Sequence, residues 1–413
     1  MKTNLHNDFL ETPQGIEAND ILRSCVHCGF CNATCPTYQL LGDELDGPRG
    51  RIYLIKQTLE GTTPTRQTQL HLDRCLTCRN CESTCPSGVK YSHLLNIGRS
   101  IVNKKVTRKK PQKLLYQLLR KLFLSRYLFT TLVRSGQFLR PVLPSQIRSL
   151  LPEKQKMLSH HGSRHERKIL LITGCVQPGL KPNIDTAAKI LFDRIGIECI
   201  ESPATKCCGS LSYHLDAEDE AVLIIKQNID NWWPLVEHNK IEAICMTASG
   251  CGVAIREYAQ LLAHDIDYSQ RAKKISQLYK DPAELIITSD PTTQETNADK
   301  ISSYLKATDI KNSIAFHPPC TLQHGMQISN VIEPFLIRCG FKVTPFKDSH
   351  LCCGSAGTYN ITQKKLSAQL LQNKLGNITS VNPDVIVTAN IGCQLHLQSG
   401  TDHPVEHWLE LLV

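Results

Sequence analysis

The sequence predicts an α+β protein of several domains, in which a helical N-terminal domain precedes two copies of an α/β module built on parallel sheets. Three observations lead to this prediction. Residues 1–98 carry two cysteine-rich runs, residues 99–168 are strongly basic, and the remainder divides into two similar halves, 169–300 and 301–413. With 413 residues and a hydrophobic fraction of 41%, the chain is long enough to form several packed cores.

The two N-terminal runs share one spacing. The pattern C-x2-C-x2-C-x3-C-P begins at Cys25 and again at Cys75. This spacing lets three thiolates reach three irons of a 4Fe-4S cluster, while the fourth cysteine ligates the other cluster. We therefore predict two 4Fe-4S clusters, the first held by Cys25, Cys28, Cys31 and Cys85, and the second held by Cys35, Cys75, Cys78 and Cys81. Zinc, which also binds paired C-x2-C motifs, is the alternative.

The rest of the N-terminal region supports a reduced, helical domain. The segment between the two runs contains helix-forming stretches on either side of Gly61, which favours an α-helical ferredoxin type of domain. The chain has nineteen cysteines, and its first residues lack the apolar stretch of a signal peptide. A reducing compartment favours thiolates on metal over disulfides, so we expect a cytoplasmic protein.

Basic charge is concentrated in one segment. Residues 99–168 contain eighteen Lys or Arg against two acids, a net +16, so the rest of the chain sums to −7 of the total +9. One helical face of this connector is apolar, with Leu115, Leu118, Leu119, Leu122 and Phe123 at helical spacing. We expect this face to pack on the protein or on a partner subunit. An anionic membrane surface is the first alternative and nucleic acid the second.

No segment predicts a membrane span. The most apolar candidate, 114–133, is interrupted by Arg120, Lys121 and Arg126. The sequence also lacks a recognisable nucleic-acid-reading module, so we expect no nucleic acid as a partner.

The two C-terminal halves repeat three cysteine features. Cys175 precedes the pair Cys207-Cys208 by 32 positions, and Cys320 precedes the pair Cys352-Cys353 by the same interval. A Gly-Cys pair follows in each half. Each feature sits in the loop at the exit of an apolar run that reads as a strand, and parallel strands bring their carboxyl ends to one edge of a sheet. We therefore expect one site per half, formed by Cys175, Cys207, Cys208 and Cys251, and by Cys320, Cys352, Cys353 and Cys393.

The content of these two sites stays open at this point. A further cluster or zinc is favoured, with redox-active thiols or a structural role as alternatives. Cys199, Cys245 and Cys339 are interpreted as buried hydrophobic residues. His317 and His396 lie near the candidate ligands, and we interpret them as hydrogen-bonded structural histidines, with metal ligation as the alternative.

Motifs for other chemistry are missing from the sequence. It contains no G-x-G-x-x-G after a strand, no Walker lysine loop and no nucleophile elbow. We therefore expect no catalytic residue on this chain and place the substrate chemistry on a partner.

These residues together resemble the iron–sulfur subunits of glycolate oxidase. The stretches that carry the resemblance are ILRSCVHCGFCNATCPTYQLLGDELDGPRGRIYLIKQ, HLDRCLTCRNCESTCPSGV, TASGCG, DSHLCCGSAGTY and TANIGCQ. The resemblance implies tandem CCG (cysteine-rich) modules after the ferredoxin domain. It also implies an electron-transfer subunit of a glycolate dehydrogenase complex, which oxidises glycolate to glyoxylate and is not catalytic alone.

The resemblance implies partners and a location as well. These are an FAD-containing catalytic subunit, a second flavin-domain subunit, a quinone or similar acceptor, and a peripheral position on the cytoplasmic face of the inner membrane. The alternatives are the iron–sulfur subunit of a glycerol-3-phosphate or D-lactate dehydrogenase, or a thiol enzyme like heterodisulfide reductase. In the latter family each module ends in C-x-x-C, whereas this chain has Ala254 and His396 in place of the final cysteine.

Overall fold

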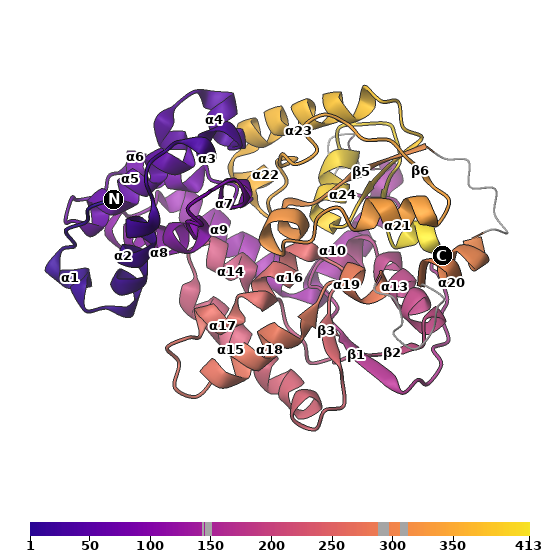
Figure 1. Cartoon of the computed structure of the whole chain (residues 1–413). Coiled ribbons are helices and arrows are strands. Elements are labelled where there is room, and N and C mark those ends of the chain that lie inside the picture. Colours follow the sequence, from indigo (N-terminus) through magenta and orange to yellow (C-terminus); the bar gives the residue numbers. More distant parts are fainter. Residues whose placement is uncertain (143, 145–150, 288–296, 306–312) are drawn as a thin grey trace.

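The computed structural model describes residues 1–142, 144, 151–287, 297–305 and 313–413. Positions 143 and 145–150 of the expected connector, and 288–296 and 306–312 around the expected boundary between the halves, lie outside the described residues. Figure 1 shows the N-terminal helices on one side of the molecule and the two α/β modules together on the other.

The N-terminal domain is helical. Its elements are α1 (Asn7–Leu10), α2 (Pro13–Ser24), α3 (Phe30–Ala33), α4 (Pro36–Leu41), the 3-10 turn η1 (Glu44–Asp46), α5 (Pro48–Leu59), α6 (Arg66–Asp73), α7 (Asn80–Ser83) and α8 (Tyr91–Lys105). Proline occupies the first turn of α2, α4 and α5, where its fixed φ and missing N–H cost the helix nothing.

Helix α8 packs on α2, α5 and α6 to form the core of this domain. Gly98 allows the close approach of α8 to α5, because a Cβ there would lie 2.5 Å from Cγ1 of Ile55. Ile101 and Val102 belong to the same buried cluster. The position at which the sequence suggested a domain boundary, residue 98, therefore lies within a helix that continues to Lys105.

The connector forms helices α9 (Lys110–Leu124) and α10 (Arg126–Leu139), followed by the short turn η2 (Arg140–Val142). Tyr116 and Leu119 of α9 are buried in a cluster with Leu215 of the first module. The apolar face of α9 thus packs on the chain itself, as expected, but the buried residues are centred to one side of the helical face that the sequence predicted. Leu118 was expected on that face but is 62% exposed.

The first module has a four-stranded parallel sheet in the order β2-β1-β3-β4. Its elements are β1 (Arg167–Leu171), α12 (Gln177–Leu180), α13 (Asn183–Arg194), β2 (Ile197–Ile200), α14 (Ser210–His214), α15 (Glu218–Glu237), β3 (Ala243–Cys245), α16 (Ser249–Arg256), α17 (Tyr258–Leu261), α18 (Ser269–Leu278), β4 (Tyr279–Lys280) and α19 (Pro282–Ile286).

The second module repeats this topology with the order β6-β5-β7-β8. Its elements are α20 (Asn297–Leu305), β5 (Ser313–His317), the π-helical turn η3 (Thr321–Gly325), α21 (Ile332–Arg338), β6 (Lys342–Val343), α22 (Tyr359–Thr362), α23 (Lys364–Thr379), β7 (Val385–Thr388), α24 (Ile391–Gln398), β8 (Val405–His407) and η4 (Glu410–Leu412). The predicted fold class, a helical domain followed by duplicated modules with parallel sheets, is confirmed.

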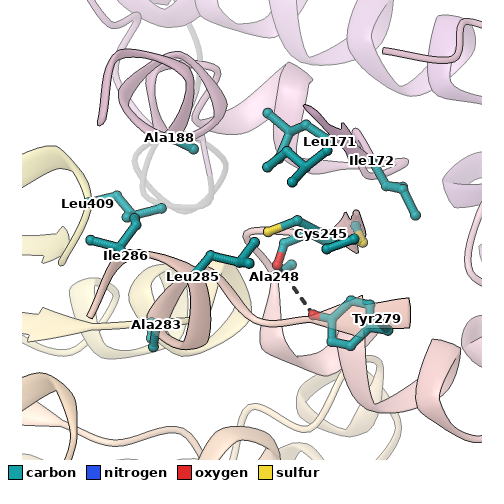
Figure 2. Packing of buried hydrophobic residues seen from close by; sticks show 14 of the residues in the cluster. Leu171, Ile172, Ala188, Cys245, Ala248, Tyr279, Ala283, Leu285, Ile286 and Leu409 are labelled. Atoms are coloured by element: carbon teal, nitrogen blue, oxygen red, sulfur yellow. Dashed lines mark hydrogen bonds between the residues drawn. The ribbon is translucent and has the colours of Figure 1, made fainter. Parts of the chain in front are cut away.

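The two modules share part of one hydrophobic core. Figure 2 shows Cys245 of β3 among apolar side chains, with Tyr279 below it donating a hydrogen bond to the backbone of Met246. Leu409, from the end of the second module, belongs to the same buried cluster as Ile286 of the first. The modules are therefore packed as one body.

The described helices contain no segment with both the length and the apolar character needed to cross a membrane.

Candidate iron–sulfur and metal sites

The two cysteine runs fold into loops of the same shape. In the first run His27 and Gly29 have positive φ, at 57° and 86°, and in the second run Thr77 and Arg79 have φ of 57° and 61°. These residues occupy matching places, two and four positions after the first cysteine. Alternation of right- and left-handed backbone curls a loop so that its N–H groups point inward, which is a common feature of iron–sulfur sites.

The structure brings the four thiols of the first predicted set together. Cys25 ends helix α2, Cys31 lies in α3, and Cys85 arrives from the second run to meet them. All four line one pocket of about 440 Å³, including its open mouth, together with Val26, Phe30, Pro48, Ile52, Pro86 and Val89. Cys28 is exposed, so this pocket opens to solvent.

The second predicted set is more enclosed. Cys81 is buried, and Cys35, Cys75 and Cys78 lie near enough to act electrostatically on its thiol. Burial raises the pKa of Cys78 and Cys81 well above the usual range of a thiol. In the first set burial raises the pKa of Cys31 to about 11. Metal binding must remove the protons from these thiols.

The donor set fits an iron–sulfur cluster. The first pocket offers the four thiols of its set, with Cys81 of the second set also in its wall, in largely apolar surroundings, and no carboxylate lines it among the described residues. Thiolates suit iron–sulfur clusters and zinc, whereas calcium and magnesium need oxygen ligands. The assignment of the eight cysteines to two clusters agrees with this arrangement but stays a prediction.

Hydrogen bonds to sulfur support the second set. Thr37 Oγ1 lies 3.3 Å from Cys35 Sγ, and Tyr91 donates its hydroxyl to Cys75 Sγ at 3.7 Å. The backbone N–H of Thr77 also donates to Cys75 Sγ at 3.4 Å. Thr37 Oγ1 donates its proton to the backbone carbonyl of Asp46 at 2.7 Å, so it is the two bonds to Cys75 Sγ that favour a thiolate and tune a bound cluster.

A buried ionic network adjoins the second cysteine set, and this network was not predicted from the sequence. Asp46 is fully buried and accepts a hydrogen bond from Arg74 at 2.7 Å, while His71 Nδ1 lies 3.0 Å away. Arg51, also fully buried, donates to the backbone carbonyl of His71 at 2.7 Å and to Thr37 Oγ1 at 3.1 Å. The partners are up to 28 positions apart in the sequence, so no local sequence pattern predicts these contacts.

The first module gathers its four predicted thiols at the carboxyl ends of β1, β2 and β3. Cys175 donates to Cys207 at 3.8 Å, and the hydrogen bonds from Cys175 and Cys208 hold the pKa of Cys207 well below its usual range. Cys251, at the start of α16, lies against Cys208. Gly209 follows the pair with φ of 89°, a conformation that other residues adopt only with strain.

The second module repeats the arrangement and adds a histidine. Contacts between neighbouring thiols run from Cys320 through Cys352 and Cys353 to Cys393. His317, the last residue of β5, lies beside them, and its ring nitrogen, Cys353 Sγ and Cys393 Sγ all fall within 4.8 Å of one another. Burial holds the pKa of His317 well below its usual range.

The two histidines behave differently. His396 Nε2 lies 3.2 Å from the hydroxyl of Ser367, as expected for a structural residue. The same interpretation is wrong for His317, because neither ring nitrogen has a hydrogen-bond partner among the described residues. A signal was present in the sequence, since His317 directly follows an apolar run and precedes Cys320 by three positions, where the first half has Ile172.

The second predicted cluster site faces the second module. Cys78 and Leu76 pack in one buried cluster with Cys320, Cys352 and Tyr359. The Tyr359 hydroxyl also donates to the backbone carbonyl of Arg74 at 3.0 Å. The thiol sites therefore form a series from the exposed first pocket, through the second set, to the second module.

The remaining cysteines are largely buried. Cys245 and Cys339 are 0% and 4% exposed, as expected for residues of a hydrophobic core. Cys199 is only partly buried, at the end of β2.

Comparisons with known proteins agree with this arrangement. Residues 21–89 match the 4Fe-4S dicluster domain, and residues 169–256 and 314–398 match the cysteine-rich domain CCG. The chain is 48% identical over its whole length to the glycolate oxidase iron–sulfur subunit of Escherichia coli (strain K12), covering 98% of that protein. It is 30% identical to a probable glycolate oxidase iron–sulfur subunit of Bacillus subtilis (strain 168), over 96% of this chain and 92% of the relative.

A solved structure shares the overall fold. The crystal structure of a hypothetical protein from Helicobacter pylori aligns with a TM-score of 0.52 and 11% identity, covering 98% of this chain and 72% of that one. At this identity the likeness concerns the fold alone.

Proposed function

The chain belongs to the family of glycolate oxidase iron–sulfur subunits, and on that premise we propose that it is the electron-transfer subunit of a complex that oxidises glycolate to glyoxylate. A partner flavin subunit performs the oxidation, and this chain accepts the electrons one at a time. The observation that carries the proposal is the pair of neighbouring thiol sets in the N-terminal domain, one lining a solvent-facing pocket and the other more enclosed.

Two 4Fe-4S clusters supply reversible one-electron transfer at these sites. The residues of the chain hold and insulate them. Cys25, Cys28, Cys31 and Cys85 hold the first, and Cys35, Cys75, Cys78 and Cys81 hold the second. The apolar wall of the first pocket limits access of water, and the hydroxyl of Tyr91 and the N–H of Thr77 donate hydrogen bonds to Cys75 Sγ of the second site.

The exposed rim of the first pocket is the proposed contact for the flavin subunit. Val26 is 68% exposed and Phe30 61% exposed, on both sides of the exposed Cys28. Apolar side chains at the edge of a redox centre allow a partner to exclude water and approach closely. The proposed partners are an FAD-containing catalytic subunit and a second flavin-domain subunit, with a quinone or similar acceptor further along the path.

The connector is the proposed contact with the membrane. Residues 109–142 contain eight Lys or Arg and no acid, and α10 exposes Tyr127 and Phe138 by 88% and 84%. Basic charge beside exposed aromatic side chains suits an anionic lipid surface. We propose a peripheral position on the cytoplasmic face of the inner membrane, with a partner subunit as the alternative occupant of this face.

The test is anaerobic reduction of the clusters by substrate. The chain is co-expressed with its flavin subunits, and the absorbance and EPR signals of the clusters are followed after addition of glycolate, D-lactate or glycerol 3-phosphate. We expect glycolate to reduce the clusters of the complex but not those of the chain alone. Reduction only by D-lactate or by glycerol 3-phosphate would assign the chain to a different dehydrogenase.

A cysteine variant locates the path within the chain. Cys28→Ala should lose the first cluster and with it the glycolate-dependent reduction of the second. Cys245→Ala is the matched control, because this thiol lies in the core of the first module, away from both sets. Full transfer in Cys28→Ala would contradict the proposed entry point.

A further inference from the structure

His317 is a buried polar side chain whose ring lacks hydrogen-bond partners among the described residues. It is 0% exposed, and both ring nitrogens lack a hydrogen-bond partner among the described residues. Burying a polar group without a partner costs about 1–3 kcal/mol, so native proteins rarely leave one unsatisfied. The ring lies against the thiols of Cys353 and Cys393. A metal ion between these three groups would satisfy the imidazole.

The spacing of the three ligand atoms fits a single ion. They lie within 4.8 Å of one another. Tetrahedral zinc, with Zn–S bonds of about 2.3 Å, separates its sulfur ligands by about 3.8 Å. The two cysteine sets of the N-terminal domain form no such compact group. A 4Fe-4S cluster holds its four thiolates at its four corners, farther apart than the ligands of a single ion. The spacing of the ligand atoms therefore distinguishes the site at His317 from the two N-terminal cysteine sets.

A buried positive charge faces these thiols. Lys374 is 2% exposed and donates to the backbone carbonyls of Asp348 and Ser349 at 2.6 and 3.2 Å, but no carboxylate of the described residues lies within ion-pair distance. Burial lowers the pKa of Lys374, and the neighbouring thiols of Cys320, Cys353 and Cys352 act in the opposite direction. A buried charge needs a counter-charge. A divalent ion with three thiolates and one neutral imidazole carries a net −1, which supplies it.

The first module lacks both the histidine and its surroundings. Ile172 stands at the position of His317, and among the described residues the four thiols of the first module belong to no group of three ligand atoms within 4.8 Å of one another. The duplicated modules have therefore diverged at the ligand that distinguishes a Cys/His site from an all-cysteine site.

We propose that the second module holds one zinc-type divalent ion in a tetrahedral site formed by His317, Cys353, Cys393 and one of the two remaining thiols, Cys352 or Cys320. Four protein ligands leave no open position, which is the arrangement of a structural zinc site. This site does not depend on the substrate of the complex or on the electron path.

The test combines metal analysis with X-ray absorption at the zinc edge, where iron does not interfere. The full chain is purified anaerobically from cells grown with zinc and iron. We expect about one zinc per chain with a scattering shell of sulfur and one nitrogen. In His317→Ala, the affinity for zinc in competition with a chelator should fall by about 100-fold or more, because a direct ligand is lost. Iron content should not change.

Two matched variants separate ligation from packing. His396→Gln removes the other buried histidine of the site, which has a hydrogen-bond partner, and should keep its zinc. His317→Cys replaces one ligand type by another and should keep the zinc with an all-sulfur shell. If His317→Ala does not fold, the His317→Cys spectrum still decides, since an unchanged shell would show that residue 317 does not touch the metal.

Three results would overturn the proposal. The first is zinc of unchanged affinity in His317→Ala. The second is a zinc shell of sulfur alone in the unmodified chain. The third is a chain without zinc whose iron content exceeds that of two clusters and falls in Cys353→Ser, which would make the site an iron–sulfur centre.

Discussion

The reduction potential of the second cluster should depend on the charge of Arg51. This guanidinium is fully buried and bonds to Thr37 Oγ1 at 3.1 Å, which in turn lies 3.3 Å from Cys35 Sγ. Placed end to end, these two distances put the guanidinium at most about 6.4 Å from a ligand sulfur of the cluster. A positive charge this close favours the reduced, more negative cluster.

The size of the effect follows from Coulomb's law. We place the charge of the cluster about 10 Å from the guanidinium and use an effective dielectric constant of about 20, which gives about 1.7 kcal/mol. For one electron this is about 70 mV. Arg51→Gln should therefore lower the potential of the second cluster by about 30–70 mV, the lower figure allowing for relaxation of Arg74 and Asp46.

The assay is a potentiometric titration of the full chain followed by EPR. Arg51→Lys is the matched control, because it keeps the charge and loses only the forked hydrogen bonds. We expect its potential to stay near that of the unmodified chain. The reasoning is refuted if both clusters are present in Arg51→Gln and neither potential moves, or if the lysine variant shifts as far as the glutamine variant.

Three further predictions concern stability. Gly354→Ala should destabilise the second module by about 2–4 kcal/mol, because φ of Gly354 is 94° and the new Cβ would lie 2.8 Å from the carbonyl oxygen of Ser367. The control is Gly340→Ala, which has φ of 102° but open space around the new Cβ and should cost only about 1–2 kcal/mol. Denaturant unfolding measures the loss of stability in both variants. Burial raises the pKa of Asp281 from 3.8 to about 7. Between these two pH values the carboxyl is protonated in the folded state but ionised in the unfolded state, so the protein loses stability as the pH rises from about 4 to about 7. Asp281→Asn should remove this loss and be more stable than the unmodified chain at pH 8, by at most about 4 kcal/mol, with little difference near pH 4 in calorimetry. Arg108 binds Asp73 of the N-terminal domain at 2.6 and 2.9 Å and also binds Asp216 of the first module. Arg108→Met should therefore weaken the contact between these two parts, at a cost of about 3–5 kcal/mol. Limited proteolysis should then cleave the connector faster than in the unmodified chain.

Local sequence determines much of this fold. The doubled spacing of the cysteine runs reflects a loop shape that depends on a few neighbouring residues, so the helical domain and its two thiol sets could be anticipated. The three cysteine features of each half likewise follow strands, and parallel strands bring their ends together.

Long-range packing accounts for what the sequence did not reveal. Arg51, Asp46 and His71 meet only when α5, η1 and α6 fold together, and none belongs to a motif. The exposure of Leu118 depends on which face of α9 meets the first module, since its neighbour Leu119 is buried there. His317 was misjudged because a hydrogen-bond partner, or its absence, is a property of the folded site.

The proposed zinc site limits the route that electrons can take. Zinc has no accessible redox change, so a zinc-bound second module would conduct no electrons, although Cys78 packs directly against its thiols. Electrons entering at the first pocket would then leave from the N-terminal domain, or reach a cluster held by Cys175, Cys207, Cys208 and Cys251 in the first module. Metal content distinguishes the two routes. About eight irons and one zinc per chain would confine electron transfer to the N-terminal domain, whereas iron beyond eight that is lost in Cys208→Ser would extend the path into the first module.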